Sequence, residues 1–175
     1  MPGGVFTAIF RSCTALTQLP PRLFRNCLEA THFGGAFSGC TQLLSVPDEF
    51  FKDLPLANHF GTVFSGCSSL VKAGKAVFSG CALAQTFSSA FYYCRVLEEV
   101  GDDIFEGCVS VTTFASVFNS CTALTALPSF VDCYKATSFD RAFYACSSLT
   151  AVRAEAFAGL SLIHISEPTR HSLIS

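Results

Sequence analysis

The segment AFSGCTQLLSVPDEFF, residues 36–51, contains the pattern that decides the fold. It has a counterpart in VFNSCTALTALPSF, residues 117–130, where Phe, Cys, Leu and Pro stand in the same order. The shared element is F-x-x-C-x-x-L, which opens at Phe37 in the first segment and at Phe118 in the second. The same element recurs along the chain, which indicates one structural unit written several times.

Three columns of phenylalanine define the repeat. Their members stand 27 residues apart, except around a two-residue deletion that follows Pro128. The columns are Phe10, Phe37, Phe64, Phe91, Phe118 and Phe143; Phe24, Phe51, Phe78, Phe105, Phe130 and Phe157; and Phe6, Phe33, Phe60, Phe87, Phe114 and Phe139. They hold 18 of the 19 phenylalanines, and only Phe50 stands outside, so the aromatic residues predict a core built by repetition.

All ten cysteines also stand at repeat positions. The two columns are Cys13, Cys40, Cys67, Cys94, Cys121 and Cys146, and Cys27, Cys81, Cys108 and Cys133, with Leu54 in the gap of the second. Free cysteine is among the most buried residue types, so we expect buried thiols. A disulfide between in-register cysteines of adjacent units is the first alternative. A metal site is the second, although no C-x-x-C pair occurs and the spacing does not match compact zinc sites.

Short helical turns are expected in each unit. Phe33, Ala36, Phe37 and Cys40 follow the i, i+3, i+4, i+7 spacing of one helix face. Asp48 precedes a Phe pair, and Asp102 precedes Ile-Phe, so either carboxylate could cap a helical turn by accepting backbone N–H bonds.

A short strand is expected before each Pro of the repeat. Residues 43–46 form an apolar run closed by Pro47, and residues 124–127 form one closed by Pro128. One unit buries too little apolar surface to offset the entropy of ordering 27 residues, so the units must stack with their strands paired. We therefore predict an α/β repeat solenoid of about six units over residues 1–159.

The segments quoted above resemble leucine-rich repeats of the BspA-like bacterial surface type, and the resemblance covers residues 1–159. It implies a right-handed coil with short parallel strands on one face and short helical turns on the other. It also implies a non-enzymatic protein-binding or adhesion module of a microbial cell-surface or secreted protein, with a protein ligand such as a host extracellular protein. A passive spacer that carries another functional domain is the alternative. The unit departs from the commonest length of that family because it has two F-x-x-C half-motifs, and no binding residue can be transferred.

Composition excludes several other classes of protein. Net charge is −2 and charged residues make up 14% of the chain, so a nucleic-acid binder that relies on a basic patch is excluded. With 50% hydrophobic residues, a disordered acidic segment is excluded as well. No run of 18 apolar residues occurs, so we expect no membrane insertion.

Both ends of the chain depart from a complete repeat protein. Residues 160–175, LSLIHISEPTRHSLIS, break the pattern, and residues 160–170 match the translation of a common sequencing-library adapter letter for letter. The adapter resumes at residues 174–175 after a short variable index. We expect a non-native, disordered tail and exclude its two histidines from functional roles. The start, residues 1–6, aligns with residues 28–33, so we expect a metagenomic fragment truncated at both ends.

Candidate chemistry is sparse. His32 and His59 share a repeat position that later holds Thr or Ser; they could bind a metal, but two ligands make a poor site, and a solvated polar column is the alternative. No G-x-S-x-G and no phosphate-binding glycine loop occurs, and the cysteines stand in core columns rather than beside a base. We therefore expect no catalytic residue, no metal and no cofactor.

The outward positions of the predicted strands are the remaining candidate. They differ between units while the core positions do not: the pairs are residues 17–18, 44–45, 71–72, 98–99, 125–126 and 150–151. Variation within a fixed frame is typical of a binding surface, and equally of an unconstrained solvent face. The candidate partner-binding strip is Gln18, Ser45, Lys72, Glu98 and Glu99. Lys72 and Glu99 could also simply neighbour each other across units.

Overall fold

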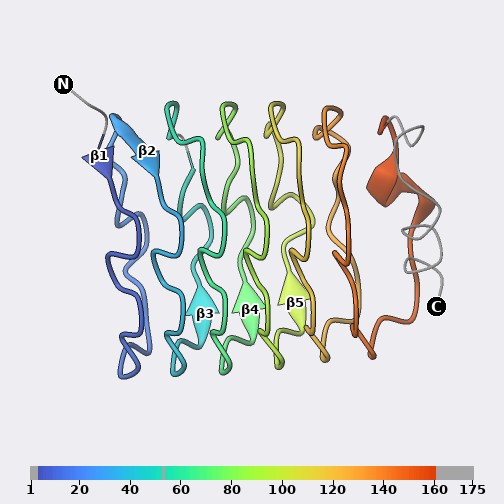
Figure 1. Cartoon of the computed structure of the whole chain (residues 1–175), viewed down its shortest axis with the longest axis horizontal. Helices are drawn as coiled ribbons and strands as arrows, with labels where there is room; N and C mark the ends of the chain where they lie inside the picture. The colour runs from blue at the N-terminus through green and yellow to red at the C-terminus, as the bar shows by residue number, and fades with distance from the viewer. Residues whose placement is uncertain (1–3, 53, 161–175) are drawn as a thin grey trace.

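The computed structural model describes residues 4–52 and 54–160. The chain winds into coils that stack side by side along one axis (Figure 1). The regular elements in this part of the chain are short: β1 Gly4–Val5, β2 Ala30–His32, β3 Ser45–Val46, β4 Lys72–Ala73, β5 Glu99–Val100 and the 3-10 helix η1 Ala154–Phe157. The repeat fold with parallel strands follows the prediction, whereas the helical content does not.

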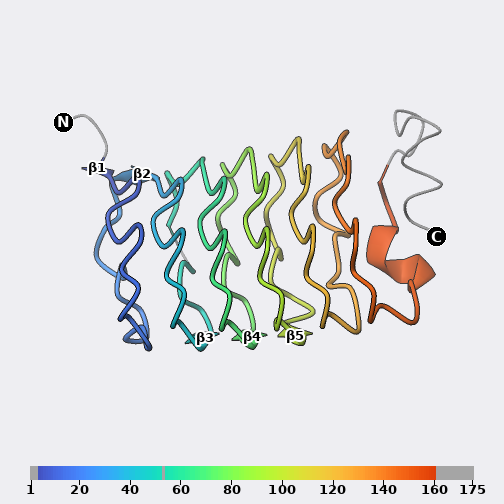
Figure 2. The ribbon, with the colours of Figure 1, turned by 60° about the horizontal axis from the view of Figure 1, so that its bottom comes forward.

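Two parallel ladders join the coils, toward opposite ends of each coil (Figure 1). The first begins with β1 and β2 and continues through single bridges that link His32, His59, Thr86, Thr113 and Ser138. The second joins β3, β4 and β5, which follow one edge of the stack in Figure 2. The sequence predicted only the second ladder, because the first runs through single polar positions with no apolar run to mark them.

Prolines limit the second ladder to three strands. Gly74 donates its N–H to the carbonyl of Val46 at 3.0 Å, and Gly101 donates to Ala73 at 3.0 Å. The same repeat position holds Pro47 before this pair and Pro128 after it. Proline has no N–H to donate, so the ladder cannot continue through either residue. The strand predicted at residues 124–127 is therefore absent, while the one predicted at residues 43–46 is present as β3.

Tight turns replace the helix predicted from Phe33 to Cys40. Ala36 donates its N–H to Phe33 and Cys40 donates to Phe37, with positive φ at Gly35 (63°) and Gly39 (73°), the third residue of each turn, as in type II turns. Two successive four-residue turns give the same i, i+3, i+4, i+7 apolar spacing as a helix, so the pattern could not separate them.

Alternate backbone N–H groups of this segment bond to the next coil, whereas Ser38 donates within its own coil to Gly35 at 3.0 Å. Phe33 donates to His59 at 2.9 Å and Phe37 donates to Val63 at 2.9 Å. Gly35 and Gly39 follow the same rule with partners 26 residues ahead. Inter-coil bonding therefore uses the donors that an α-helix would have needed.

Aspartates cap neighbouring coils rather than their own turns. Asp48 accepts the N–H of Lys75 at 2.8 Å, and Asp103 accepts the N–H of Ala76 at 2.9 Å. Asp102, the residue expected to cap, forms an ion pair with Arg153 instead. The expected capping chemistry is present, but it acts between coils.

The three phenylalanine columns form the core, as predicted. Within a column the rings are nearly parallel: Phe33 and Phe60 have centroids 5.5 Å apart and an interplanar angle of 5°. Between columns they meet edge to face, as Phe51 and Phe60 do at 5.2 Å and 64°. These are the two arrangements that aromatic pairs prefer. Phe50, outside the columns, is also buried and lies edge-on to Phe51 at 4.8 Å.

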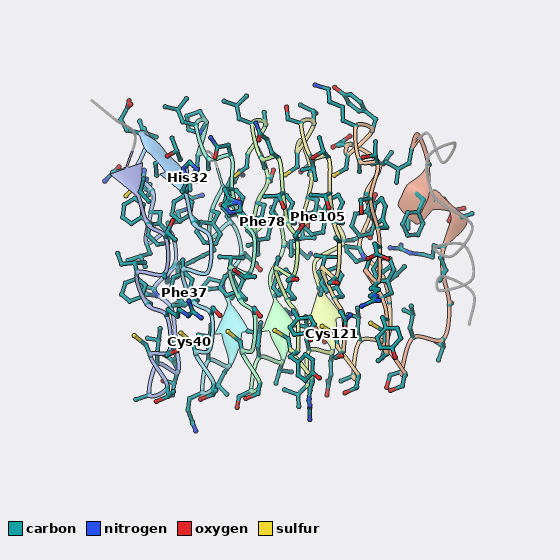
Figure 3. All side chains as sticks on the ribbon, in the orientation of Figure 1. His32, Phe37, Cys40, Phe78, Phe105 and Cys121 are labelled. Atoms are coloured by element: carbon teal, nitrogen blue, oxygen red, sulfur yellow. The ribbon has the colours of Figure 1, made fainter. Side chains whose placement is uncertain are left out.

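Cysteine thiols link adjacent coils through hydrogen bonds. Cys67 donates its S–H to the carbonyl of Phe37 at 3.2 Å, and Cys94 donates to the carbonyl of Phe64 at 3.2 Å. Each carbonyl also accepts the N–H of the cysteine three residues later in its own coil. Cys40 and Cys121 lie on one line across the stack, and Phe78 and Phe105 occupy matching places in their coils (Figure 3).

The first residue of the predicted tail, Leu160, lies among the described residues. Leu160, assigned to the tail by sequence, packs against the core with 9% of its surface exposed. It follows Phe157 by three residues and so takes the place of a cysteine in the second column, as Leu54 does. The predicted non-native tail otherwise falls on residues 161–175, which lie outside the described residues, and it stays a prediction.

Gly101→Ala should destabilise the stack because the coils approach closely at this position. A Cβ atom on Gly101 would lie 2.5 Å from the carbonyl oxygen of Gly74 and 2.7 Å from the Cα of Lys75. We expect a loss of about 1–3 kcal/mol in the free energy of unfolding, measured by chemical denaturation. The control Thr125→Ala, at an exposed position, should change it by less than ~0.5 kcal/mol. Equal small losses in both variants would contradict the close approach.

Candidate functional site

The structure brings part of the predicted strip together. Ser45, Lys72 and Glu99 are register partners across β3, β4 and β5, and all three are exposed. Glu98 is exposed beside Glu99 and donates its N–H to Val71. Gln18 is exposed in the preceding coil, which the second ladder does not reach; a single backbone bond from Leu44 to Thr17 joins the two coils there.

Lys72 and Glu99 form an ion pair on this strip. The Nζ of Lys72 lies 3.0 Å from Oε2 of Glu99, and the two side chains are 56% and 66% exposed. The hydrogen bond to Glu99 raises the pKa of Lys72 above its usual range. Leu44 and Val71 are exposed apolar residues at the adjoining positions. The strip therefore presents an apolar edge beside a charge pair that water already screens.

A second charged group joins the first two coils through Glu49. Its carboxylate pairs with Lys52 at 2.7 Å and with Arg22. Hydrogen bonds from Lys52 first and Arg22 second lower the pKa of Glu49 to about 2. Arg22 pairs with Glu49 across the two coils and Lys52 pairs with it within one coil, so this group is structural.

An acidic hollow of about 510 Å³ lies between Lys75 and Asp132. Its carboxylates are engaged in coil-to-coil contacts: Asp103 accepts a backbone N–H, Asp132 accepts that of Gly107, and Asp102 pairs with Arg153. Within residues 4–52 and 54–160, no three His, Cys, Asp or Glu side chains are placed to hold a metal ion.

The ten cysteines are all free thiols in the structure, and seven of them are buried. Burial raises the pKa of Cys67 and of Cys133 to about 12, and that of Cys146 to about 11. A thiol with such a pKa stays protonated near neutral pH and can donate the hydrogen bonds described above. The thiolate is the nucleophile and the metal ligand, so these columns are poorly suited to either role.

The two histidines of the first ladder are stacked neighbours. The rings of His32 and His59 have centroids 5.8 Å apart and meet edge to face at 74°. Burial, and then the charge of His32, lower the pKa of His59 below its usual range. A Cβ on Gly61 would lie 2.9 Å from the His59 ring, so the imidazole occupies the space that a side chain there would need.

Sequence reasoning missed a second surface, formed by tyrosines and arginine. A hollow of about 350 Å³ is lined by Tyr92, Tyr93, Asn119, Ser120, Arg141 and Tyr144. Arg95 lies over the Tyr93 ring, with its guanidinium carbon 4.8 Å from the ring centroid. Three of the four tyrosines of the chain stand here, and this clustering was the sequence signal that could have identified the surface.

No protein-family model matches the chain, and no curated protein matches it either. Among solved structures, it is similar to a leucine-rich-repeat protein from Eubacterium ventriosum, with 20% identity and a TM-score of 0.39 over 81% of this chain and 30% of that one. A leucine-rich-repeat protein of T. pallidum gives 21% identity and a TM-score of 0.30 over 77% and 71% of the two chains. A leucine-rich cell-surface protein from Faecalibacterium prausnitzii gives 14% identity and a TM-score of 0.22 over 89% and 78%.

These three structures belong to the class of bacterial repeat protein that the F-x-x-C-x-x-L pattern resembles. The chain spans only 30% of the first of them. Backbone hydrogen bonds between neighbouring coils define the architecture of this chain. In the described part of the chain, no helix has the length and apolar character needed to cross a membrane.

Thiol reactivity should separate the cysteines by burial. In the native chain at about pH 8, an aromatic disulfide reagent should react quickly with Cys13, which is exposed, and slowly with Cys27 and Cys146. The seven buried thiols should react only after unfolding, and in denaturant all ten cysteines should react with the reagent. Fast labelling of Cys94 in the native chain, detected by peptide mass spectrometry, would show that the cysteine columns are accessible.

Stability should fall with acidification because of His59. Its pKa in the folded chain is below the usual value of 6.5, so the unfolded chain binds more protons between those two values. The free energy of unfolding should therefore decrease as pH falls through about 6.5 and level off below the folded-state pKa. Urea titrations at about pH 7.5 and about pH 5.5 measure this loss. His59→Thr, which copies Thr86 of the next coil, should reduce this pH-dependent loss. An unchanged loss in the variant would show that His59 is not its source.

Proposed function

We propose that the chain is part of a right-handed leucine-rich-repeat solenoid, and that it acts as a non-enzymatic module that binds a protein. The proposal places it in a cell-surface or secreted microbial protein with a role in adhesion. The observation that carries it is the exposed strip across β3, β4 and β5. There the outward residues change from Ser45 to Lys72 to Glu99, while the inward positions stay apolar with Val46, Ala73 and Val100.

The chemistry of the strip supports a protein partner. Parallel strands present one outward side chain per coil at a repeat of about 4.8 Å, which gives a regular, extended surface. Leu44 and Val71 supply apolar contact area, and Lys72, Glu98 and Glu99 supply charge beside it. An apolar centre with a polar border is the usual composition of a protein interface.

A passive spacer is the second candidate function. The observation that favours it is the Lys72–Glu99 pair, because the two charges already satisfy each other within the chain. In that case the stack would hold another domain of a longer protein at a distance, and no outward residue would contact a partner.

The two functions are separated by binding measurements on the repeat region. We expect at least one of a panel of purified host extracellular proteins, immobilised for interferometry, to bind the intact chain. The double variant Lys72→Ala, Glu99→Ala should weaken that binding and leave the thermal midpoint nearly unchanged, since both side chains are exposed. The swapped variant Lys72→Glu, Glu99→Lys keeps the ion pair but reverses the displayed charges, so it should also weaken binding. If the unmodified chain and both double variants bind the partner equally, the strip is not the binding surface.

A further inference from the structure

The tyrosine-lined hollow is built from the exposed tips of the second type II turn in each coil. From the second coil to the sixth, the two central residues of that turn are Ser38-Gly39, Ser65-Gly66, Tyr92-Tyr93, Asn119-Ser120 and Tyr144-Ala145, and all but the buried Asn119 are exposed or half-buried. Backbone bonds hold the last three tips side by side: Tyr93 donates to Asn119 at 2.9 Å, and Ser120 donates to Tyr144 at 2.8 Å. At this turn the sequence therefore changes from Ser-Gly in the second and third coils to Tyr-Tyr in the fourth.

Tyr93 and Arg141 stand where the backbone favours glycine. Their φ angles are 61° and 51°, and the matching residues of the second coil are Gly39 at 73° and Gly35 at 63°. A side chain in this left-handed region is disfavoured by its Cβ atom. Neither residue adds to the core, because both are exposed. Ten other non-glycine residues of the described chain share this left-handed φ, including Ser120 and Thr62 at the matching repeat positions, so the angle alone marks no site. What distinguishes Tyr93 and Arg141 is that large, exposed side chains stand at turn positions that elsewhere hold Gly, Ser, Thr or Ala.

The hollow combines aromatic faces with hydrogen-bond donors. Tyr144 is 59% exposed, so its ring offers surface to a ligand. Tyr93 is 38% exposed, but Arg95 lies over its ring and the Tyr92 ring packs against it with centroids 4.6 Å apart, so it offers only the uncovered part of its ring. Asn119 is the only buried polar side chain among the described residues, with 7% exposed. Its Oδ1 accepts a hydrogen bond from Ser120 at 2.8 Å, and no described residue accepts one from its amide nitrogen. That N–H2 group is therefore available at the wall of the hollow.

The charge of the hollow is positive and uncompensated. Neither Arg141 nor Arg95 forms an ion pair with any described residue. Arg95 holds its guanidinium over Tyr93 instead. A planar guanidinium binds a carboxylate through two parallel hydrogen bonds, so Arg141 fits an acidic ligand.

We propose that this hollow binds an acidic sugar unit of a glycan. The Tyr144 ring lies against the apolar face of the sugar ring, with the exposed part of Tyr93 beside it. Asn119 and Ser120 bond the hydroxyl groups of the sugar, and Arg141 binds its carboxylate. A volume of about 350 Å³ is at the small end of the roughly 300–1,000 Å³ of small-molecule sites, which suits one sugar unit with its neighbours outside. The site is separate from the β3–β5 strip and does not depend on the protein-binding role proposed for it.

The test uses the full chain and two matched oligosaccharides. A hyaluronan tetrasaccharide, which carries glucuronate, should bind in calorimetry or in NMR titration, and the neutral chitin tetrasaccharide should bind at least about tenfold more weakly. Arg141→Gln should weaken the acidic tetrasaccharide by at least about tenfold, because a charge-assisted bond is lost. Tyr93→Gly should also weaken binding while leaving the thermal midpoint unchanged or higher, since glycine suits that φ angle.

Two controls make the outcome specific. Tyr134→Ala removes an exposed tyrosine that does not line the hollow and should leave sugar binding unchanged. The strip variant Lys72→Ala, Glu99→Ala should also bind the acidic sugar normally, so failure of the strip and failure of the hollow are distinguishable. The proposal is overturned if neither sugar binds, if both bind equally, or if a glutamate-rich peptide competes for Arg141 more strongly than the tetrasaccharide does.

Discussion

The distance between neighbouring coils is the constraint on which the rest of the structure depends. It is set by backbone hydrogen bonds between residues about one repeat apart, such as those from Phe33 to His59 and from Phe37 to Val63. At this spacing, a side chain repeated in every coil must pack against its own copy. A flat ring can do so: Phe37 and Phe64 stack with centroids 5.5 Å apart, and Phe64 and Phe91 repeat that distance. Edge-to-face contacts between the columns then close the space between stacks, so most of the large core residues can be phenylalanine.

The polar groups of the coils follow from the same constraint. A stack with few regular strands must still satisfy its buried backbone groups. Here the side chains contribute: the thiol of Cys94 donates to a carbonyl of the preceding coil, and the carboxylates of Asp48 and Asp103 accept N–H groups of a neighbouring coil. An alkyl side chain of similar size would fill the place of a cysteine without donating that bond. The cysteines thus act as hydrogen-bonding core residues, and burial keeps them protonated.

Sequence periodicity could predict the core and the stacking, because each phenylalanine column is visible as a fixed spacing. It could not separate two successive turns from a helix at residues 33–40, since both give the same apolar spacing. The three glycines of the segment, at 34, 35 and 39, were a local signal against a helix. It could predict β3 but not where its ladder ends, because the sequence does not show that the residue after each strand supplies the N–H that joins two coils. Gly74 donates this N–H to Val46, whereas Pro128 has none to donate to Val100. The tyrosine-lined hollow was missed because its residues come from three coils and differ in type at the turn position that most of them share.

The described surface offers two places where outward residues depart from the repeat, the β3–β5 strip and the hollow at Tyr92–Tyr93, and both rely on the regular stack beneath them. Contacts between rings one repeat apart therefore test the account most directly. With selectively labelled phenylalanine, through-space NMR should show contacts from the Phe64 ring to both the Phe37 and the Phe91 rings, and none directly between Phe37 and Phe91. Absence of the Phe64 contacts in the folded chain would contradict the stacked core.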